Sequence, residues 1–225
     1  MAITRRRLLT HCSALGIAIA MGMPVIPASA QGQALAAARR TTILVVGDSL
    51  SAEYGLKRGS GWVALLEQRL ANEKIAASVV NASISGDTTS GGRSRLTALL
   101  KQHSPTHVII ELGGNDALRG LPLAMTQANL AAMAKEAKAA GARVLIVGMQ
   151  VPPNYGSKYG NDFAALFATV AKEEGAALVP FLLKGVVDAP QAEALFQSDR
   201  IHPREAAHPA MLDNVWATLK GLLPR

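Results

Sequence analysis

The chain is 225 residues long, 49% hydrophobic and 17% charged, which excludes a disordered chain or a coiled coil and favours one domain with a sizeable core. Aromatic residues make up only 4%, so the core is built mainly from Ala, Val, Leu and Ile, as in a parallel sheet covered by helices. The formal net charge is +7, but the basic residues are scattered singly, so we expect a mildly basic surface and no nucleic-acid partner.

The first thirty residues have the three parts of a secretory signal peptide. Three arginines stand at 5–7, an apolar stretch runs over 14–26, and small residues at 28–30 precede a cleavage point before Gln31. The order Thr-Arg-Arg-x-Leu-Leu at 4–9 also resembles a twin-arginine signal, so Sec and twin-arginine export both stay open. Cleavage would remove three basic and no acidic residues, which lowers the net charge from +7 to +4. We therefore predict a bacterial protein that is exported, periplasmic or secreted, with no stable membrane anchor.

Removal of this segment would leave a domain without cysteine. The one cysteine, Cys12, lies inside it, which excludes disulfides, thiolate metal sites and a cysteine nucleophile from the mature protein. Residues 31–41 are polar and rich in alanine, and we interpret them as a lead-in to a single folded domain over 42–225. The sequence leaves the oligomeric state open.

From Thr42 onward, strand and helix patterns alternate. Short apolar or β-branched runs predict five strands, over 42–46, 77–81, 107–112, 143–148 and 177–181. Apolar residues at helical spacing predict helices around 62–70, 93–101, 130–137, 163–170 and 212–219. This order predicts an α/β fold in which a parallel sheet is covered on both faces, a doubly wound three-layer α/β/α sandwich.

Polar clusters lie at three strand ends and before the last helix. Ser49 follows a buried strand, where its hydroxyl can project at the edge of the sheet on which ligands bind. Asp199 and His202 are three residues apart, so one turn can hold the carboxylate against one imidazole nitrogen while the other nitrogen faces a nucleophile. The Gly86 N–H and the Asn115 amide are suitable donors to an oxyanion. Together these clusters predict acyl transfer by an activated serine.

The same clusters resemble the motif blocks of the SGNH (GDSL) hydrolases. The matching segments are Gly47-Asp48-Ser49-Leu50, 81–88 with Gly86, 113–116 and 199–203, and the resemblance covers 42–222. It is closest to the branch of arylesterases, thioesterase I and lysophospholipases, to which the segments 51–54, 118–120 and 152–156 are also similar. The resemblance implies a flavodoxin-like, five-stranded fold. It also implies hydrolysis of small-molecule esters, thioesters or lipids without a metal or other cofactor.

Carried over position by position, the resemblance assigns a role to each of five residues. Ser49 would be the nucleophile, His202 the general base, and Asp199 the residue that orients His202. The oxyanion would be bound by the N–H groups of Ser49 and Gly86 and by the Asn115 amide.

Residues that border the predicted site bear on substrate preference. Glu53 and Arg200 stand where that branch often has glycine or another small residue, so both are expected to affect preference rather than the reaction. We expect the acyl group to be bound by apolar side chains near the site, Leu118, Leu121, Val151 and Tyr155. A carbohydrate acetylesterase remains an alternative, as does a flavodoxin-like ligand-binding protein, although the carboxylate of Asp48 would repel a bound phosphate. His208 is expected at the surface.

Overall fold

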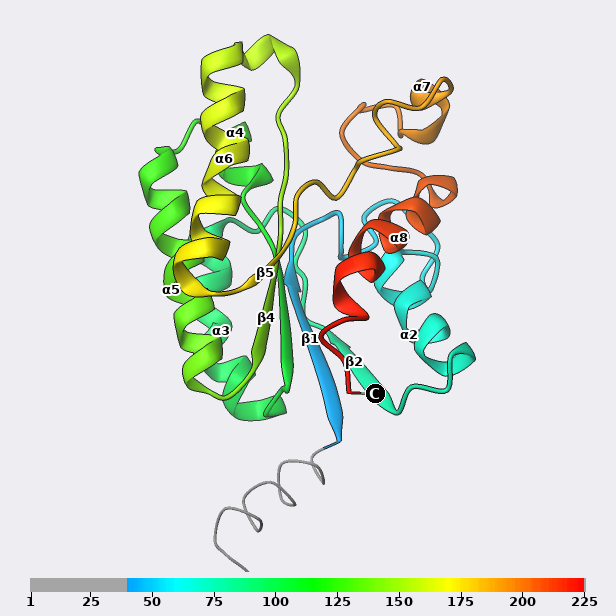
Figure 1. Cartoon of the computed structure of the whole chain (residues 1–225). Coiled ribbons are helices and arrows are strands. Elements are labelled where there is room, and N and C mark those ends of the chain that lie inside the picture. Colours follow the sequence, from blue (N-terminus) through cyan, green and yellow to red (C-terminus); the bar gives the residue numbers. More distant parts are fainter. Residues whose placement is uncertain (1–39, 225) are drawn as a thin grey trace, which may run out of the picture. The chain divides into compact units, whose positions relative to one another are not determined.

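The computed structural model describes residues 40–224 (Figure 1). The signal peptide predicted over 1–30 lies outside the described residues, as does the lead-in apart from its last two positions. The first strand begins at Thr41, one residue before the predicted start of the folded domain.

Five parallel strands form one sheet, as expected. They are β1 (Thr41–Gly47), β2 (Ala77–Asn81), β3 (His107–Glu111), β4 (Arg143–Val147) and β5 (Ala177–Val179). Their order across the sheet is β2-β1-β3-β4-β5, with every neighbouring pair parallel. This is the flavodoxin-like order, and its switch in direction lies between β1 and β3, where such sheets bind ligands.

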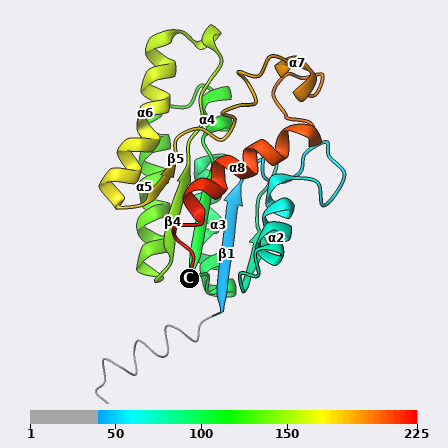
Figure 2. The same cartoon turned by 45° about the vertical axis from the view of Figure 1, so that its right-hand side comes forward.

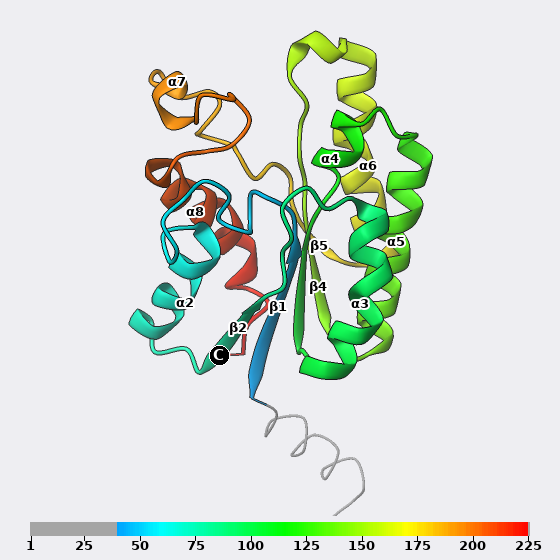
Figure 3. The same ribbon diagram turned by 180° about the vertical axis from the view of Figure 1, so that it is seen from behind.

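Helices cover both faces of the sheet and complete the three predicted layers. On one face α3 (Thr89–His103), α5 (Leu123–Ala139) and α6 (Ser157–Glu174) pack side by side. On the other face α2 (Trp62–Asn72) packs against α8 (His208–Leu219). Figures 1 and 3 show these two groups from opposite sides, and the intermediate view in Figure 2 shows α8 crossing in front of the sheet.

Short helical turns at the loops were not predicted. They are α4 (Gly114–Leu118), α7 (Ala192–Leu195) and the 3₁₀ turns η1 (Pro153–Tyr155) and η2 (Glu205–Ala207). These turns are too short to repeat an apolar face, so hydrophobic periodicity cannot reveal them. The longer α3 begins four residues before its predicted start because the side chain of Thr88 caps it, accepting the Gly91 N–H at 3.2 Å.

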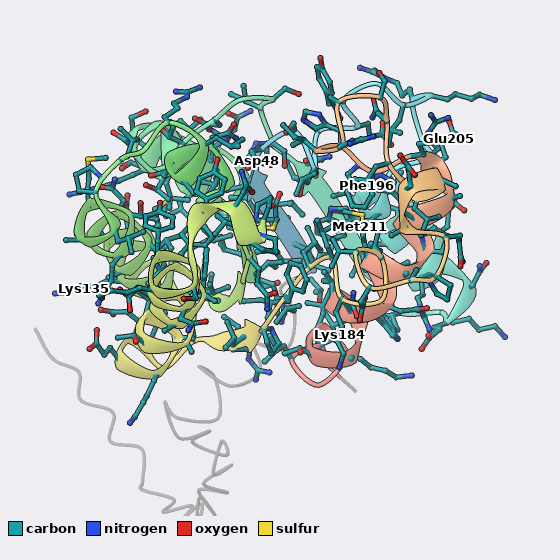
Figure 4. The ribbon with its side chains drawn as sticks, turned by 90° about the horizontal axis from the view of Figure 1, so that it is seen from above. Asp48, Lys135, Lys184, Phe196, Glu205 and Met211 are labelled. Atoms are coloured by element: carbon teal, nitrogen blue, oxygen red, sulfur yellow. The ribbon has the colours of Figure 1, made fainter. Side chains whose placement is uncertain are left out.

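The two central strands give the site a rigid base. Residues 43–46 of β1 and 108–110 of β3 are completely buried, and the largest buried side chains are Trp62, Phe163 and Phe167. Figure 4 looks down on the carboxyl ends of the strands and shows Asp48 at the end of β1, between the two helical layers. No helix within residues 40–224 is long and apolar enough to cross a membrane.

The expectation that His208 lies at the surface is wrong. Its side chain is buried at the start of α8, and its Nδ1 accepts the Trp62 N–H at 3.0 Å. This bond satisfies a backbone donor in the first turn of α2, where the helix has no internal acceptor to offer. Burial lowers the pKa of His208 below its usual value, so the neutral ring that accepts this bond is favoured.

Candidate active site

Ser49 lies two residues beyond the end of β1, in a tight turn that requires glycine at position 47. A Cβ on Gly47 would lie 2.8 Å from Ser51 Oγ and 2.9 Å from Ser83 Oγ, closer than side chains can approach. The Gly47 carbonyl accepts the Ile84 N–H at 3.0 Å, which ties this turn to the loop after β2. Because strand and turn are held on both sides, the half-buried Ser49 has a defined position at the edge of the sheet.

The structure brings together Ser49, His202 and Asp199, the three residues expected to act as a triad. Ser49 Oγ lies 2.9 Å from His202 Nε2, and His202 Nδ1 lies 2.7 Å from Asp199 Oδ2. The other carboxylate oxygen of Asp199 accepts the N–H groups of Ile201 at 2.9 Å and His202 at 3.0 Å. Desolvation would raise the pKa of Asp199, but the hydrogen bonds from His202 and Ile201 outweigh it and lower that pKa to about 2. Asp199 is therefore anionic at neutral pH and suited to orient the imidazole.

An aromatic ring packs on this imidazole. The ring centroids of Tyr54 and His202 are 4.3 Å apart, and Tyr54 remains 49% exposed. The Tyr54 carbonyl accepts the Gln197 side-chain amide at 2.9 Å, and the same amide nitrogen lies 3.3 Å from the Pro203 carbonyl. The sequence motif contained Tyr54 but gave it no role, because nothing local pairs it with a histidine so far along the chain.

The predicted oxyanion donors come from three separate loops. Within residues 40–224, neither the Ser49 N–H nor the Gly86 N–H donates to another protein group. Gly86 has a φ of +80°, a backbone conformation that favours glycine. Asn115, in α4, uses its amide fully: Nδ2 donates to Asp48 Oδ2 at 3.0 Å and to the Asp87 carbonyl at 2.9 Å. An oxyanion would therefore take one of these two hydrogens from its present acceptor.

Two buried carboxyl groups lie beneath the turn that carries Ser49. Asp48 Oδ1 accepts the Leu50 N–H at 3.0 Å, and Glu111 Oε2 accepts the Ser51 hydroxyl at 2.7 Å. Burial raises the pKa of Asp48 to about 6 and raises that of Glu111 well above its usual range.

A buried network holds α4, the short helix that carries Asn115. Asp116 is completely buried and accepts the Thr89 N–H at 2.9 Å and the Thr126 hydroxyl at 3.2 Å. These bonds join α4 to the first turns of α3 and α5. The position of Asn115 is thus fixed by its neighbour in sequence.

The predicted acyl-site residues lie on two segments at the same edge of the sheet. Leu118 is 51% exposed and Leu121 is half-buried. Between them Arg119 donates to the Gly86 carbonyl at 2.8 Å, which ties this stretch to the loop after β2. Val151 and Tyr155 are half-buried on the segment after β4.

The two departures from the family pattern share one backbone feature. Glu53 and Arg200 both have a φ of 59°, in the left-handed region where glycine is favoured. The Glu53 carboxylate accepts the N–H groups of Gly59 at 3.0 Å and Gly61 at 2.8 Å, so it stabilises its own loop. The Arg200 side chain is 81% exposed and pairs with Glu193 at 3.1 Å.

Within the part of the chain that the structure describes, no group of three or more His, Cys, Asp or Glu side chains is placed to hold a metal ion.

Comparison with known proteins gives concordant results. The model of the GDSL-like lipase/acylhydrolase family matches residues 45–210. The esterase TesA of Pseudomonas aeruginosa is 55% identical over 182 residues, 81% of this chain and 89% of that protein. The thioesterase 1/protease 1/lysophospholipase L1 of Escherichia coli K12 is 44% identical over 187 residues, 83% of this chain and 87% of that protein. A crystal structure of the esterase EstA from Pseudoalteromonas, inhibited by monoethylphosphonate, is 40% identical with a TM-score of 0.76, covering 81% of this chain and 98% of that one.

Proposed function

The chain belongs to the GDSL-like lipase/acylhydrolase family and is an ester hydrolase, and we propose that it works through a triad of Ser49, His202 and Asp199. The observation that carries this proposal is the unbroken contact from Ser49 Oγ through both imidazole nitrogens to Asp199 Oδ2, at 2.9 and 2.7 Å. The ligand-binding alternative has no support among these relatives, which are named as enzymes.

The proposed reaction has two acyl-transfer steps. Ser49 Oγ attacks the ester carbonyl carbon while His202 Nε2 takes its proton, and His202 then returns this proton to the departing alcohol. An acyl group remains bonded to Ser49. Water attacks this acyl-enzyme with His202 again acting as base, and the acid product leaves with Ser49 restored. The anionic Asp199 stabilises the imidazolium that forms in each step.

The negative charge that develops on the carbonyl oxygen needs donors on the side opposite His202. The N–H groups of Ser49 and Gly86 are free to donate within the described residues, and Asn115 can redirect one amide hydrogen. Donors that are already in place stabilise the transition state without further rearrangement. No step in this scheme requires a metal.

Apolar side chains at the site favour an acyl chain over a sugar. Tyr54 and Leu118 are both exposed, and Ile84 and Ile201, next to the oxyanion and triad loops, are exposed by 52% and 46%. Exposed apolar residues gathered around a reactive centre typically bind an apolar ligand. We propose fatty-acyl or aryl esters, including lysophospholipids, as substrates, with thioesters as a second class and acetylated carbohydrates as the alternative.

The decisive test is the Ser49→Ala variant together with a fluorophosphonate. The wild-type protein should gain one adduct, on Ser49 by peptide mass analysis, and lose activity. Ser49→Ala should fold normally, remain unlabelled and be inactive on aryl esters of every chain length. A labelled serine elsewhere, or an active variant, would disprove the triad. Running acetyl to decanoyl esters, a lysophospholipid and an acetylated sugar side by side identifies the substrate class.

Residues 1–30 are proposed to direct export, from the basic, apolar and small-residue segments in their sequence. Cleavage after Ala30 would give an exported protein whose N-terminus is Gln31, which intact mass measurement detects. In that case cytosolic acyl thioesters would not reach the enzyme, and extracytoplasmic esters or lysophospholipids would be its substrates. Finding the uncleaved chain only in the cytosol would contradict export.

A further inference from the structure

A line of contacts runs from Glu111, at the end of β3, to the amide proposed to bind the oxyanion. The strand register pairs Glu111 with Gly47, so its side chain reaches the turn that follows β1. There it accepts the Ser51 hydroxyl at 2.7 Å, and its carboxyl group lies near that of Asp48, whose negative charge helps to raise the pKa of Glu111. Asp48 in turn accepts the Asn115 amide at 3.0 Å. Glu111 is therefore hydrogen-bonded to Ser51 in the turn that carries Ser49, and it lies beside Asp48, the side chain that holds Asn115.

The hydrogen bonds determine which carboxyl group carries a proton. Both oxygens of Asp48 accept N–H groups, one from Leu50 and one from Asn115, so Asp48 acts as an anion. Two neighbouring buried carboxyl groups favour a state with one proton between them, because two anions would repel each other in a site from which water is excluded. Glu111 is only 2% exposed and forms no ion pair with a basic side chain of residues 40–224, so the proton belongs to Glu111. The pair as a whole then has a single negative charge.

We propose that protonated Glu111 is a positioning residue for catalysis, which fixes the carboxylate of Asp48 and through it the direction of the Asn115 amide. This inference rests on the oxyanion role of Asn115 proposed above. An amide side chain can be turned by 180° so that its oxygen and nitrogen exchange places. The Asp48 carboxylate repels the amide oxygen and accepts only the amide nitrogen, so it selects the orientation in which N–H groups face the loops after β1 and β2. Glu111 keeps Asp48 in this orientation by donating to it.

The test compares two substitutions of the same residue. Glu111→Gln keeps an N–H donor for Asp48 and an oxygen that accepts the Ser51 hydroxyl, so kcat should stay within about threefold of wild type. Glu111→Leu removes the donor and the acceptor, and kcat should fall about 5- to 30-fold, part of the roughly 30- to 150-fold loss expected when the Asn115 donor itself is removed. KM should change by no more than about twofold in either variant, because Glu111 does not touch the substrate.

Asp48→Asn tests the same line of contacts with a smaller change. The carboxylate accepts two N–H groups, from Leu50 and Asn115, whereas an amide offers only one oxygen. One of the two donors must then face an NH₂ group, so kcat should fall at least about tenfold at unchanged KM. This variant keeps the size of the side chain, so it decides the matter if Glu111→Leu does not fold.

Ile109→Val is the matched control, since Ile109 is buried two residues earlier on the same face of β3 and its side chain has no group that can hydrogen-bond to the pair. It should lower the melting temperature and leave kcat unchanged. Equal losses in Glu111→Gln and Glu111→Leu, or wild-type kcat in both Glu111→Leu and Asp48→Asn, would overturn the inference. Ser49→Ala is assayed alongside, and activity in this variant would mean that the triad itself is wrong. If Ser49→Ala is inactive while Glu111→Leu and Asp48→Asn are fully active, only the role of Glu111 is refuted.

Discussion

Replacement of Asn115 by alanine tests the oxyanion site most directly. Asn115 donates one amide hydrogen to the Asp48 carboxylate and the other to the Asp87 carbonyl. To bind an oxyanion, the amide must give up or share the bond to the neutral carbonyl, since the bond to the carboxylate is the stronger of the two. The benefit in the transition state is therefore smaller than for a donor that is free beforehand.

The magnitude follows from these two bonds. Loss of one oxyanion donor costs about 2.7–4 kcal/mol, and a neutral hydrogen bond contributes about 1 kcal/mol net. The difference, roughly 2–3 kcal/mol, corresponds to a decrease in kcat of about 30- to 150-fold. KM should change little, because the ground-state carbonyl is a weak acceptor. Asn115→Asp should be more impaired still, since it replaces the donors by a second carboxylate beside Asp48.

The assay is the hydrolysis of a chromogenic aryl ester over a range of concentrations that separates kcat from KM. Asn214→Ala is the matched control, because the Asn214 amide also donates to two backbone carbonyls, of Leu182 at 2.9 Å and Lys184 at 2.8 Å, but from α8. Its kcat should equal that of wild type. A rise in KM alone in Asn115→Ala would mean that Asn115 binds substrate, and a loss of less than threefold would remove it from the oxyanion site.

Two further predictions concern specificity and stability. Changing Leu118 and Leu121 to serine should reduce kcat/KM progressively from acetyl to decanoyl esters, because each CH₂ removed from an apolar site costs at most about 0.8 kcal/mol; a penalty independent of chain length would show that they do not bind the acyl group. Burial lowers the pKa of His208 below 6.5, the ordinary value of an exposed imidazole, so the stability that its neutral ring contributes should be lost as pH falls below 6.5. His208→Gln keeps an acceptor for the Trp62 N–H, so urea unfolding should show a smaller loss of stability from pH 7.5 to 5.5 than in wild type. The raised pKa of Asp48 increases stability as pH falls over this range, and it does so equally in wild type and His208→Gln. The informative quantity is therefore the difference in unfolding free energy between the two proteins, and parallel pH profiles would contradict the argument.

Features that depend on a few neighbouring residues could be predicted from the sequence. The strand β2 was predicted with its observed bounds, and the other strands within one or two residues at either end, because their apolar runs stop at turn residues. The turn that holds Asp199 against His202 is also local, since the two residues are three apart and share one carboxylate. The match to family motifs then assigned Ser49 as their partner, which spacing alone could not do.

Features that depend on contact between distant segments were decided by the tertiary structure. The register that pairs Gly47 with Glu111 brings a second carboxyl group beneath the Ser49 turn, and nothing near Glu111 in the sequence indicates this. The packing of α2 on α8 buries His208, which its place beside Pro209 near the start of the last helix suggested would be exposed. The ring of Tyr54 on His202 and both acceptors of the Asn115 amide likewise come from other loops. The sequence by itself therefore determined which elements form and which residues can react, because periodicity and turn chemistry act over a few residues. The environment of those residues was decided only when the sheet aligned its strands, because burial and hydrogen-bond partners depend on which distant segments meet.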